Sequence, residues 1–192
     1  MNSKSDNRSV QRTKQLLKES LITLLQTTSI TKISVTQLTQ MANLNRGTFY
    51  LHYNDIYSLL DDLENDIVNN IMSILRKHRS VNTVSCVFPI LYDFFQYIKE
   101  NSNICQTLLK TENHNAFLQK IKNIVQEECF STWDVLFNQR GKRFYPAYYS
   151  FVLFGCIGLM EYWIENGMQE TPEEIAHIAE SIIINGHEIL KL

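Results

Sequence analysis

The sequence has 192 residues, of which 44% are hydrophobic, so it can bury a core of ordinary domain size and is not intrinsically disordered. Six glycines and three prolines are too few for the turns of an all-β sandwich or barrel. The net charge of −2 is unevenly spread, because residues 1–60 carry seven Lys/Arg and three Asp/Glu whereas residues 61–192 carry eleven and seventeen. A basic N-terminal third suggests a polyanion contact at one end, although so small an excess also arises by chance.

The first part of the chain predicts a helix followed by two short ones. Residues 1–11 are polar without apolar periodicity, so we expect a flexible arm. Leucines at helical spacing predict an amphipathic helix over residues 12–26. Ser34 with Gln37 three residues later predicts a capping box, and the short helix that follows has an apolar face of Val35, Leu38, Met41 and Ala42. Asn45 suits the N-cap of a second short helix, so residues 34–53 predict a helix-turn-helix.

Six more helices are predicted in the remainder of the chain. Asp55 is expected to cap a long helix that runs to residue 79, and Pro146 to lie in the first turn of a helix that Gly167 ends. Thr171 starts the last helix, which runs to about residue 190. The others cover residues 84–99, 101–110 and 115–137. The expected fold is all-α with about nine helices, divided into a helix-turn-helix domain over residues 1–54 and a larger helical domain over residues 55–192.

The second short helix carries the polar groups best suited to DNA. Arg46 can reach a phosphate or the acceptor edge of guanine, and Gly47 lets the backbone approach closely. Thr48 and Tyr50 offer hydroxyl groups to phosphates, and Thr36 opens the preceding helix. The predicted DNA-contacting residues are Ser34, Thr36, Asn45, Arg46, Gly47, Thr48, Tyr50, His52 and Tyr53.

This segment resembles the TetR family of bacterial regulators over roughly residues 10–60. The matching residues are Ser34-Val35, Leu38, Met41-Ala42, Asn43-Leu44-Asn45 and the run Arg46-Gly47-Thr48-Phe49-Tyr50-Leu51-His52-Tyr53. Two positions depart from the family pattern. Asn43 stands where the turn usually has glycine, and it tolerates a left-handed backbone. Ile56 stands where the fourth helix commonly begins with a phosphate-binding lysine, so His52, Tyr53 or the arm are expected to replace that contact.

The C-terminal half contains Phe154-Gly155-Cys156-Ile157-Gly158, Tyr162-Trp163-Ile164-Glu165-Asn166-Gly167 and Thr171-Pro172-Glu173-Glu174. With these runs it is similar to a Firmicutes-type subgroup of that family, which implies a DNA-binding domain over residues 1–54 and a regulatory and dimerisation domain over residues 55–192. The resemblance implies that the last two long helices pair with their copies in a homodimer; an ordinary intramolecular core is the alternative. The predicted interface residues are Gly155, Gly158, Tyr162, Ile175, Ile178 and Ile182. The resemblance also implies an effector pocket for a small hydrophobic or aromatic molecule, or no inducible pocket at all. The candidate pocket residues are Tyr92, Phe95, His114, Phe117 and Tyr148, each of which is equally compatible with plain core.

Other functions have less support in the sequence. The five histidines are scattered without a metal-ligand spacing, and no cofactor motif or nucleophile motif is present, so an enzyme is not expected. Cys86, Cys105, Cys129 and Cys156 show no zinc-finger spacing, and a redox role for them is left open. Residues 1–12 are polar and residues 144–160 are too short and too polar for a membrane span, which predicts a cytoplasmic protein without a membrane partner.

The resulting hypothesis is a homodimeric repressor that binds a pseudo-palindromic operator and is released by a small ligand. One alternative is a DNA-bound architectural or scaffolding protein that recruits a protein partner without an inducer. Another is a ligand-binding protein whose helix-turn-helix has lost its function.

Overall fold

The computed structural model describes residues 3–78, 87–111, 114–133 and 144–186. Within these residues it contains nine α-helices, one short 3-10 helix and no strand, which confirms the all-α prediction. The chain divides into two compact units, Met1–Ile67 with Lys110–His114, and Val68–Leu109 with Asn115–Leu192. This division lies inside a helix, and the functional boundary after residue 54 stays a prediction.

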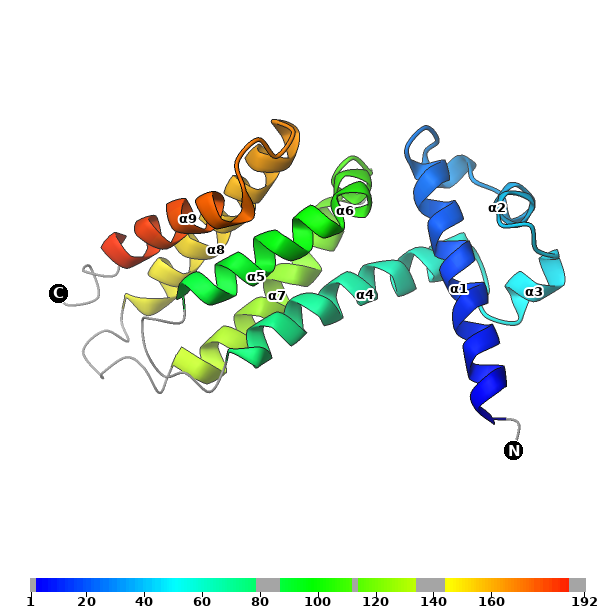
Figure 1. Cartoon of the computed structure of the whole chain (residues 1–192), viewed down its shortest axis with the longest axis horizontal. Coiled ribbons are helices and arrows are strands. Elements are labelled where there is room, and N and C mark those ends of the chain that lie inside the picture. Colours follow the sequence, from blue (N-terminus) through cyan, green and yellow to red (C-terminus); the bar gives the residue numbers. More distant parts are fainter. Residues whose placement is uncertain (1–2, 79–86, 112–113, 134–143, 187–192) are drawn as a thin grey trace. The chain divides into compact units, whose positions relative to one another are not determined.

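The first unit is built on three helices and the start of a fourth. Helix α1 (Ser3–Leu25) lies beside α2 (Val35–Met41), and α2 lies beside α3 (Arg46–Tyr50), as Figure 1 shows. A 3-10 helix (Ile30–Lys32) joins α1 to α2, and α4 (Ile56–Lys77) begins in this unit. Its fully buried side chains are those of Leu17, Leu21, Leu38, Phe49 and Leu59. Burying such aliphatic and aromatic groups is the main force that holds these short helices together.

The expected N-terminal arm is helical instead. Helix α1 begins at Ser3, so the prediction of an irregular arm over residues 1–11 is wrong for residues 3–11. The side chains of residues 8–12 are exposed. An apolar face is not needed here, because a helix that is already nucleated extends at little cost through polar residues.

Capping groups begin α4 and the last helix where the sequence predicts them. The backbone N–H of Ser58 donates to Asp55 Oδ1 at 2.7 Å, and the N–H of Asp55 donates to Ser58 Oγ at 3.2 Å. In the same way, Glu174 N–H donates to Thr171 Oγ1 at 3.2 Å, and Thr171 N–H donates to Glu174 Oε2 at 2.8 Å. Both pairs satisfy backbone donors that a helix N-terminus leaves free.

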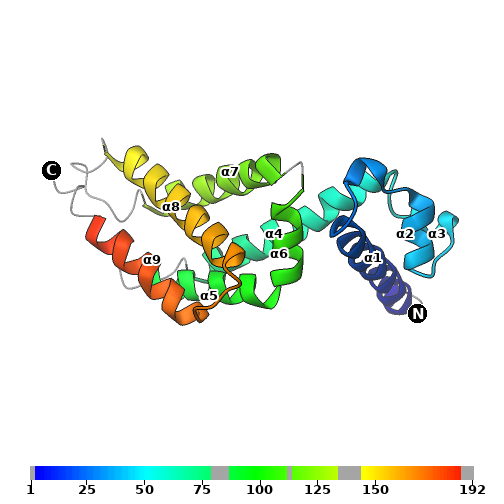
Figure 2. The same ribbon diagram turned by 90° about the horizontal axis from the view of Figure 1, so that it is seen from above.

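The second unit is a bundle around Trp163 and Phe95, which are both fully buried. Its helices are α5 (Val87–Glu100), α6 (Ser102–Leu109), α7 (His114–Trp133), α8 (Tyr145–Glu165) and α9 (Pro172–Gly186), together with the later part of α4. Helix α9 contacts both α5 and α8, which lie beside it in Figure 1 and Figure 2. The rings of Phe95 and Trp163 meet edge to face with centroids 5.5 Å apart. Gly167, with φ of 79°, ends α8 as expected.

Helix α8 has the predicted bounds but differs from its prediction in burial. It continues past Met160, and the span Pro146–Glu165 is long and apolar enough to cross a membrane, contrary to the expectation from residues 144–160. Only 28% of its most apolar window is buried, so α8 is not the buried helix that its composition predicts. Phe151, Phe154 and Tyr162 are 66%, 57% and 55% exposed.

Candidate nucleic-acid interface and internal cavity

The turn between α2 and α3 has the geometry that its sequence predicts. Ser34 Oγ accepts from the backbone N–H of Gln37 at 3.2 Å, and Gln37 Oε1 accepts from the N–H of Ser34 at 3.0 Å, which confirms the capping box. Asn43 has φ of 52°, the left-handed conformation for which asparagine is well suited. Asn45 occupies the N-cap of α3, but its side chain makes no capping hydrogen bond. The Asn45 side chain therefore does not cap α3.

Most of the predicted contact residues, on α2, on α3 and beside them, are accessible to solvent. The side chains of Ser34, Thr36, Asn45, Arg46 and Tyr50 are exposed, and those of Thr48 and His52 are half-buried. Arg46 and Tyr50 lie one helical turn apart on the same face, since Arg46 Nη2 donates to the Tyr50 hydroxyl oxygen at 3.4 Å. The structure therefore groups a guanidinium and a phenol on one exposed helix surface, where both can meet a nucleic acid.

Gly47 leaves the backbone of α3 open between these side chains. It is exposed, and a Cβ atom added to it would meet no atom within 4 Å. The fold therefore does not require glycine here. The bare backbone instead permits a close approach by an external group, for example a phosphate oxygen at the helix N-terminus.

Tyr53 is an exception among the predicted contact residues. Its side chain is 6% exposed, and its hydroxyl donates to Asp62 Oδ2 at 2.6 Å. The predicted contact of Tyr53 with DNA is corrected: its ring packs in the core and its hydroxyl already donates to Asp62, so Tyr53 stabilises the fold. Phe49 and Tyr53 have ring centroids 5.8 Å apart. Tyr53 thus fixes the end of the helix-turn-helix to α4.

Asp62 is the centre of a charged cluster that joins α1 to α4. Lys18 Nζ lies 3.1 Å and Lys14 Nζ lies 3.4 Å from Asp62 Oδ2, and Lys18 also pairs with Asp66. Burial opposes ionisation of Asp62, but hydrogen bonds from Tyr53 and Lys18 outweigh it and hold its pKa below the ordinary value. Burial, followed by the hydrogen bond to Asp62, raises the pKa of Tyr53. The carboxylate is therefore the charged partner that orients Tyr53 and two lysines.

Replacing Asp62 by asparagine is expected to lower the free energy of unfolding by about 1–3 kcal/mol at pH 7, because charge-assisted hydrogen bonds are lost. A folded-state pKa below the unfolded one stabilises the fold above the ordinary carboxyl pKa of about 4. That stabilisation disappears as the pH falls through the folded-state value. Urea denaturation at pH 7 and pH 3 should show the difference between wild type and Asp62→Asn at pH 7 and a much smaller one at pH 3. Asp61→Asn, on the exposed neighbour, is the control, and an equal loss from both variants would contradict this role.

Three exposed apolar or aromatic side chains near α3 were not predicted. Leu51 is 79%, Tyr57 is 50% and Met41 is 47% exposed. Met41 was expected on the buried face of α2, but it lies in the last turn, where the chain already bends toward α3. Ile56 is buried, so no cation takes the position after the helix-turn-helix. Tyr57 is the exposed side chain next to it.

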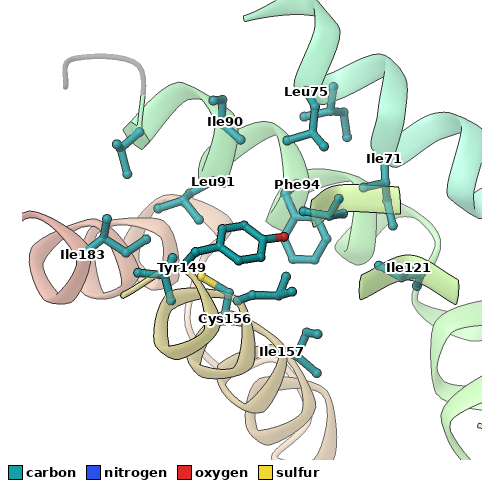
Figure 3. Close-up of a pocket in the computed structure, with 15 residues that line it drawn as sticks. Ile71, Leu75, Ile90, Leu91, Phe94, Ile121, Tyr149, Cys156, Ile157 and Ile183 are labelled. Atoms are coloured by element: carbon teal, nitrogen blue, oxygen red, sulfur yellow. The ribbon is translucent and has the colours of Figure 1, made fainter. Parts of the chain in front are cut away.

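The second unit contains a cavity of about 180 Å³. Five helices contribute to its wall, and Figure 3 shows Tyr149 of α8 projecting into it between residues from α5 and α7. The lining residues are Ile71, Ile74, Leu75, Val87, Ile90, Leu91, Phe94, Ile121, Val125, Tyr149, Val152, Leu153, Cys156, Ile157 and Ile183. The wall is almost wholly hydrocarbon, as expected of a site for an apolar molecule.

The structure brings none of the five predicted pocket residues to this cavity. Phe95 packs against Trp163, and the hydroxyl of Tyr148 donates to the carbonyl oxygen of Ile183 at 2.6 Å. Phe117 is buried outside the lining, and Tyr92 is 37% exposed. His114 Nδ1 lies 3.1 Å from the carbonyl oxygen of Thr111. None of the five lines this cavity, and their role in effector binding stays a prediction.

The aromatic residues that do line the cavity are Phe94 and Tyr149, the immediate neighbours of predicted Phe95 and Tyr148. Adjacent residues on a helix point about 100° apart, so an error of one position exchanges core for cavity. An uninterrupted apolar run such as the one in α8 gives no periodic signal that distinguishes the two faces.

The structure describes the side chains of two of the four cysteines, Cys105 and Cys156. Burial raises the pKa of the Cys105 thiol to about 12 and that of the Cys156 thiol to about 11. Both thiols are therefore protonated near neutral pH and are weak nucleophiles. Cys86 lies outside the described residues, and the side chain of Cys129 does as well. Within the described part of the chain, no group of three or more His, Cys, Asp or Glu side chains could hold a metal ion.

The outer surfaces of α8 and α9 carry most of the predicted interface residues. Gly155, Gly158 and Tyr162 are exposed on α8, and Ile178 and Ile182 are 45% and 53% exposed on α9. Phe151 and Phe154 extend the α8 surface and were missed. Ile175 is 1% exposed and belongs to the core of the unit, so its predicted place in an interface is wrong. Residues three apart on a helix lie about 60° from one another around its axis, so Ile175 faces the core and Ile178 lies at the exposed edge of that face.

An exposed helix-turn-helix followed by a helical body with an internal cavity defines the class of the protein: it is an all-helical DNA-binding regulator. The model of the "Transcriptional regulator C-terminal region" matches residues 87–185, more than half of the chain. The chain belongs to the TetR family of transcriptional regulators. Members of this family are regulators rather than enzymes, as the sequence predicts.

Solved structures of regulators share this fold. A TetR transcriptional regulator from Streptococcus agalactiae is 22% identical with a TM-score of 0.67, covering 95% of this chain and 99% of that one. The fatty acid degradation regulator FadR from Bacillus halodurans is 12% identical, with a TM-score of 0.68 and coverages of 91% and 95%. NalD, the secondary repressor of the MexAB-OprM multidrug efflux pump in Pseudomonas aeruginosa, is 15% identical, with a TM-score of 0.66 and coverages of 93% and 97%. No curated protein sequence matches the chain.

Proposed function

We propose that the protein is a homodimeric repressor that binds a pseudo-palindromic operator and is released when a small molecule occupies the body. The exposed pair of Arg46 and Tyr50 beside the open backbone of Gly47 is the observation that carries this proposal. Two such helices, one from each protomer, would enter successive major grooves about 34–36 Å apart. Ser34, Thr36, Asn45, Thr48 and His52 would hold the DNA backbone beside them.

The apolar surfaces of α8 and α9 support a homodimer. Large exposed apolar patches mark sites of association, and a helix surface with Phe151, Phe154, Ile178 and Ile182 outward would otherwise lie in water. A single helix with the length and composition of a membrane span is weak support for a membrane protein when its family consists of DNA-binding regulators. We therefore assign this surface to a second copy of the chain, with the glycines of α8 allowing close approach.

Helix α4 connects the proposed DNA-binding unit to the unit that contains the cavity. Leu59 and Leu63 are buried in the first unit, whereas Ile71, Ile74 and Leu75 of the same helix line the cavity of the second. A ligand that changes the position of α4 in the body would change the separation of the two recognition helices. The ligand can shift this equilibrium only by its difference in affinity for the two states. The repressors among the solved relatives, such as NalD, favour this direction of regulation.

Chromatin occupancy in the source cell tests the proposal against an architectural or scaffolding role. A repressor should occupy one or a few promoters, and deletion of the protein should raise transcription from them. Many dispersed sites without a transcriptional change would instead support an architectural protein.

A Gly47→Ala variant tests the contact by the α3 backbone. Because the added methyl group meets no atom of the protein, the thermal midpoint should change little, whereas operator affinity should fall by about tenfold if DNA approaches this backbone. Mobility-shift titration and thermal unfolding of the same preparation separate the two effects. Unchanged operator affinity would show that DNA does not approach Gly47.

A further inference from the structure

We propose that the cavity in the second unit binds one small, uncharged hydrocarbon molecule about the size of a benzene ring or a short alkyl chain. This inference names the chemical class of the effector and rests on the proposed function, in which a small molecule regulates the protein. The binding itself can be tested without DNA.

The wall of the cavity offers packing contacts and almost no polar ones. Twelve of its fifteen described lining residues are Ile, Leu or Val, and the others are Phe94, Tyr149 and Cys156 (Figure 3). None of these fifteen side chains carries a charge, since the thiol of Cys156 keeps its proton. A ligand would therefore gain affinity from burying its own apolar surface.

The cavity is partly open, and its volume sets the size of the ligand part that it can bury. In another protein, an apolar cavity of about 150 Å³ lined by Leu, Ile and Phe stays dry and binds benzene. The cavity here is of similar size, about 180 Å³, and has the same kind of lining. One six-membered ring with a small substituent, or an alkyl chain of a few carbons, would fill it.

Charged analogues of the same shape should be excluded. A carboxylate or ammonium group placed in this lining would lose its hydration without gaining an ionic partner among the lining residues. The polar groups at the end of α4 already have a partner on α5: Asp93 Oδ2 lies 2.7 Å from Lys77 Nζ and 2.8 Å from His78 Nε2. Recruiting Lys77 or His78 to a ligand would break this cluster.

The test compares toluene, benzoate and benzylammonium, which share a ring and differ in charge, on the full-length protein at pH 7. At ten times its dissociation constant, toluene should raise the thermal midpoint by about 3 °C or more, and calorimetry should give a stoichiometry of one per chain. Benzoate and benzylammonium should produce no shift at the same concentration.

Variants locate the binding to the cavity. Val152→Phe fills the lining from α8 and should abolish the toluene shift. Val10→Phe makes the same change at an exposed position of α1 and should retain it. If Val152→Phe does not fold, Val125→Phe fills the cavity from α7. A toluene shift that persists in the folded filling variant, an equal shift from either charged analogue, or no shift from toluene would overturn the proposal.

A mobility shift with and without toluene separates this inference from the proposed function. If toluene binds in the cavity but leaves operator affinity unchanged, the ligand class stands and release by a ligand fails. If a charged molecule releases the operator while toluene does not bind, regulation by a ligand stands and the ligand class proposed here is overturned.

Discussion

Replacing Arg46 by alanine is expected to weaken operator binding by about 5- to 150-fold, the loss typical of one specific DNA contact. The guanidinium is exposed at the first residue of α3 and is aligned with the Tyr50 hydroxyl, so both groups face the same surface. Removing it should leave the fold intact, because the core side chain of this helix is Phe49. A mobility-shift titration at several salt concentrations measures the effect.

The salt dependence then shows what Arg46 binds. If it contacts a phosphate, affinity should fall equally for all sequences and the slope of log affinity against log salt should lose about one unit. If it contacts guanine, the variant should instead lose discrimination at one base pair. Arg76→Ala, an exposed arginine on the later part of α4, is the matched control. Equal operator affinity of wild type and Arg46→Ala would remove Arg46 from the interface.

Placing two acids on the outer surface of α9, as Ile178→Asp with Ile182→Asp, is expected to convert the proposed dimer to a monomer. Both side chains are about half exposed within one chain, so the fold should tolerate aspartate. In a dimer the same carboxylates would be desolvated without a partner, at a cost of several kcal/mol each. The mass measured by light scattering should fall from twice 22.5 kDa to 22.5 kDa, and operator binding should be lost with it.

Val10→Asp is the control for this double variant, since it places an acid at an exposed aliphatic position on α1, a helix of the other unit. It should remain a dimer. A double variant that stays dimeric at micromolar concentration would contradict the assignment of this surface to the second copy.

Local signals predicted the elements well. Ser34 with Gln37, Asp55 with Ser58, and Thr171 with Glu174 act within one helical turn, so their sequence spacing is sufficient to place three helix starts. The helical structure of residues 3–11 was missed for a related reason: a polar helix extension has no apolar periodicity that predicts it.

Side-chain orientation was predicted less well where the choice depends on tertiary packing. The place of Tyr53 at the end of the helix-turn-helix motif predicted a contact with DNA. In the structure its hydroxyl donates a hydrogen bond to Asp62, nine residues later on α4. Ile175 and Ile178 are alike in sequence, yet only packing on the core decides which is buried. The same limit explains why Phe95 was chosen in place of Phe94 at the cavity.

The central claim is that α3 from each of two protomers reads one operator. Footprinting of the purified protein on the promoter region of its own or a neighbouring gene tests this claim most directly. The account predicts a salt-sensitive, sequence-specific footprint with two half-sites separated by one helical turn or a multiple of it, and its loss in Arg46→Ala. A well-folded dimer that gives no specific footprint, or one unchanged in Arg46→Ala, would contradict it.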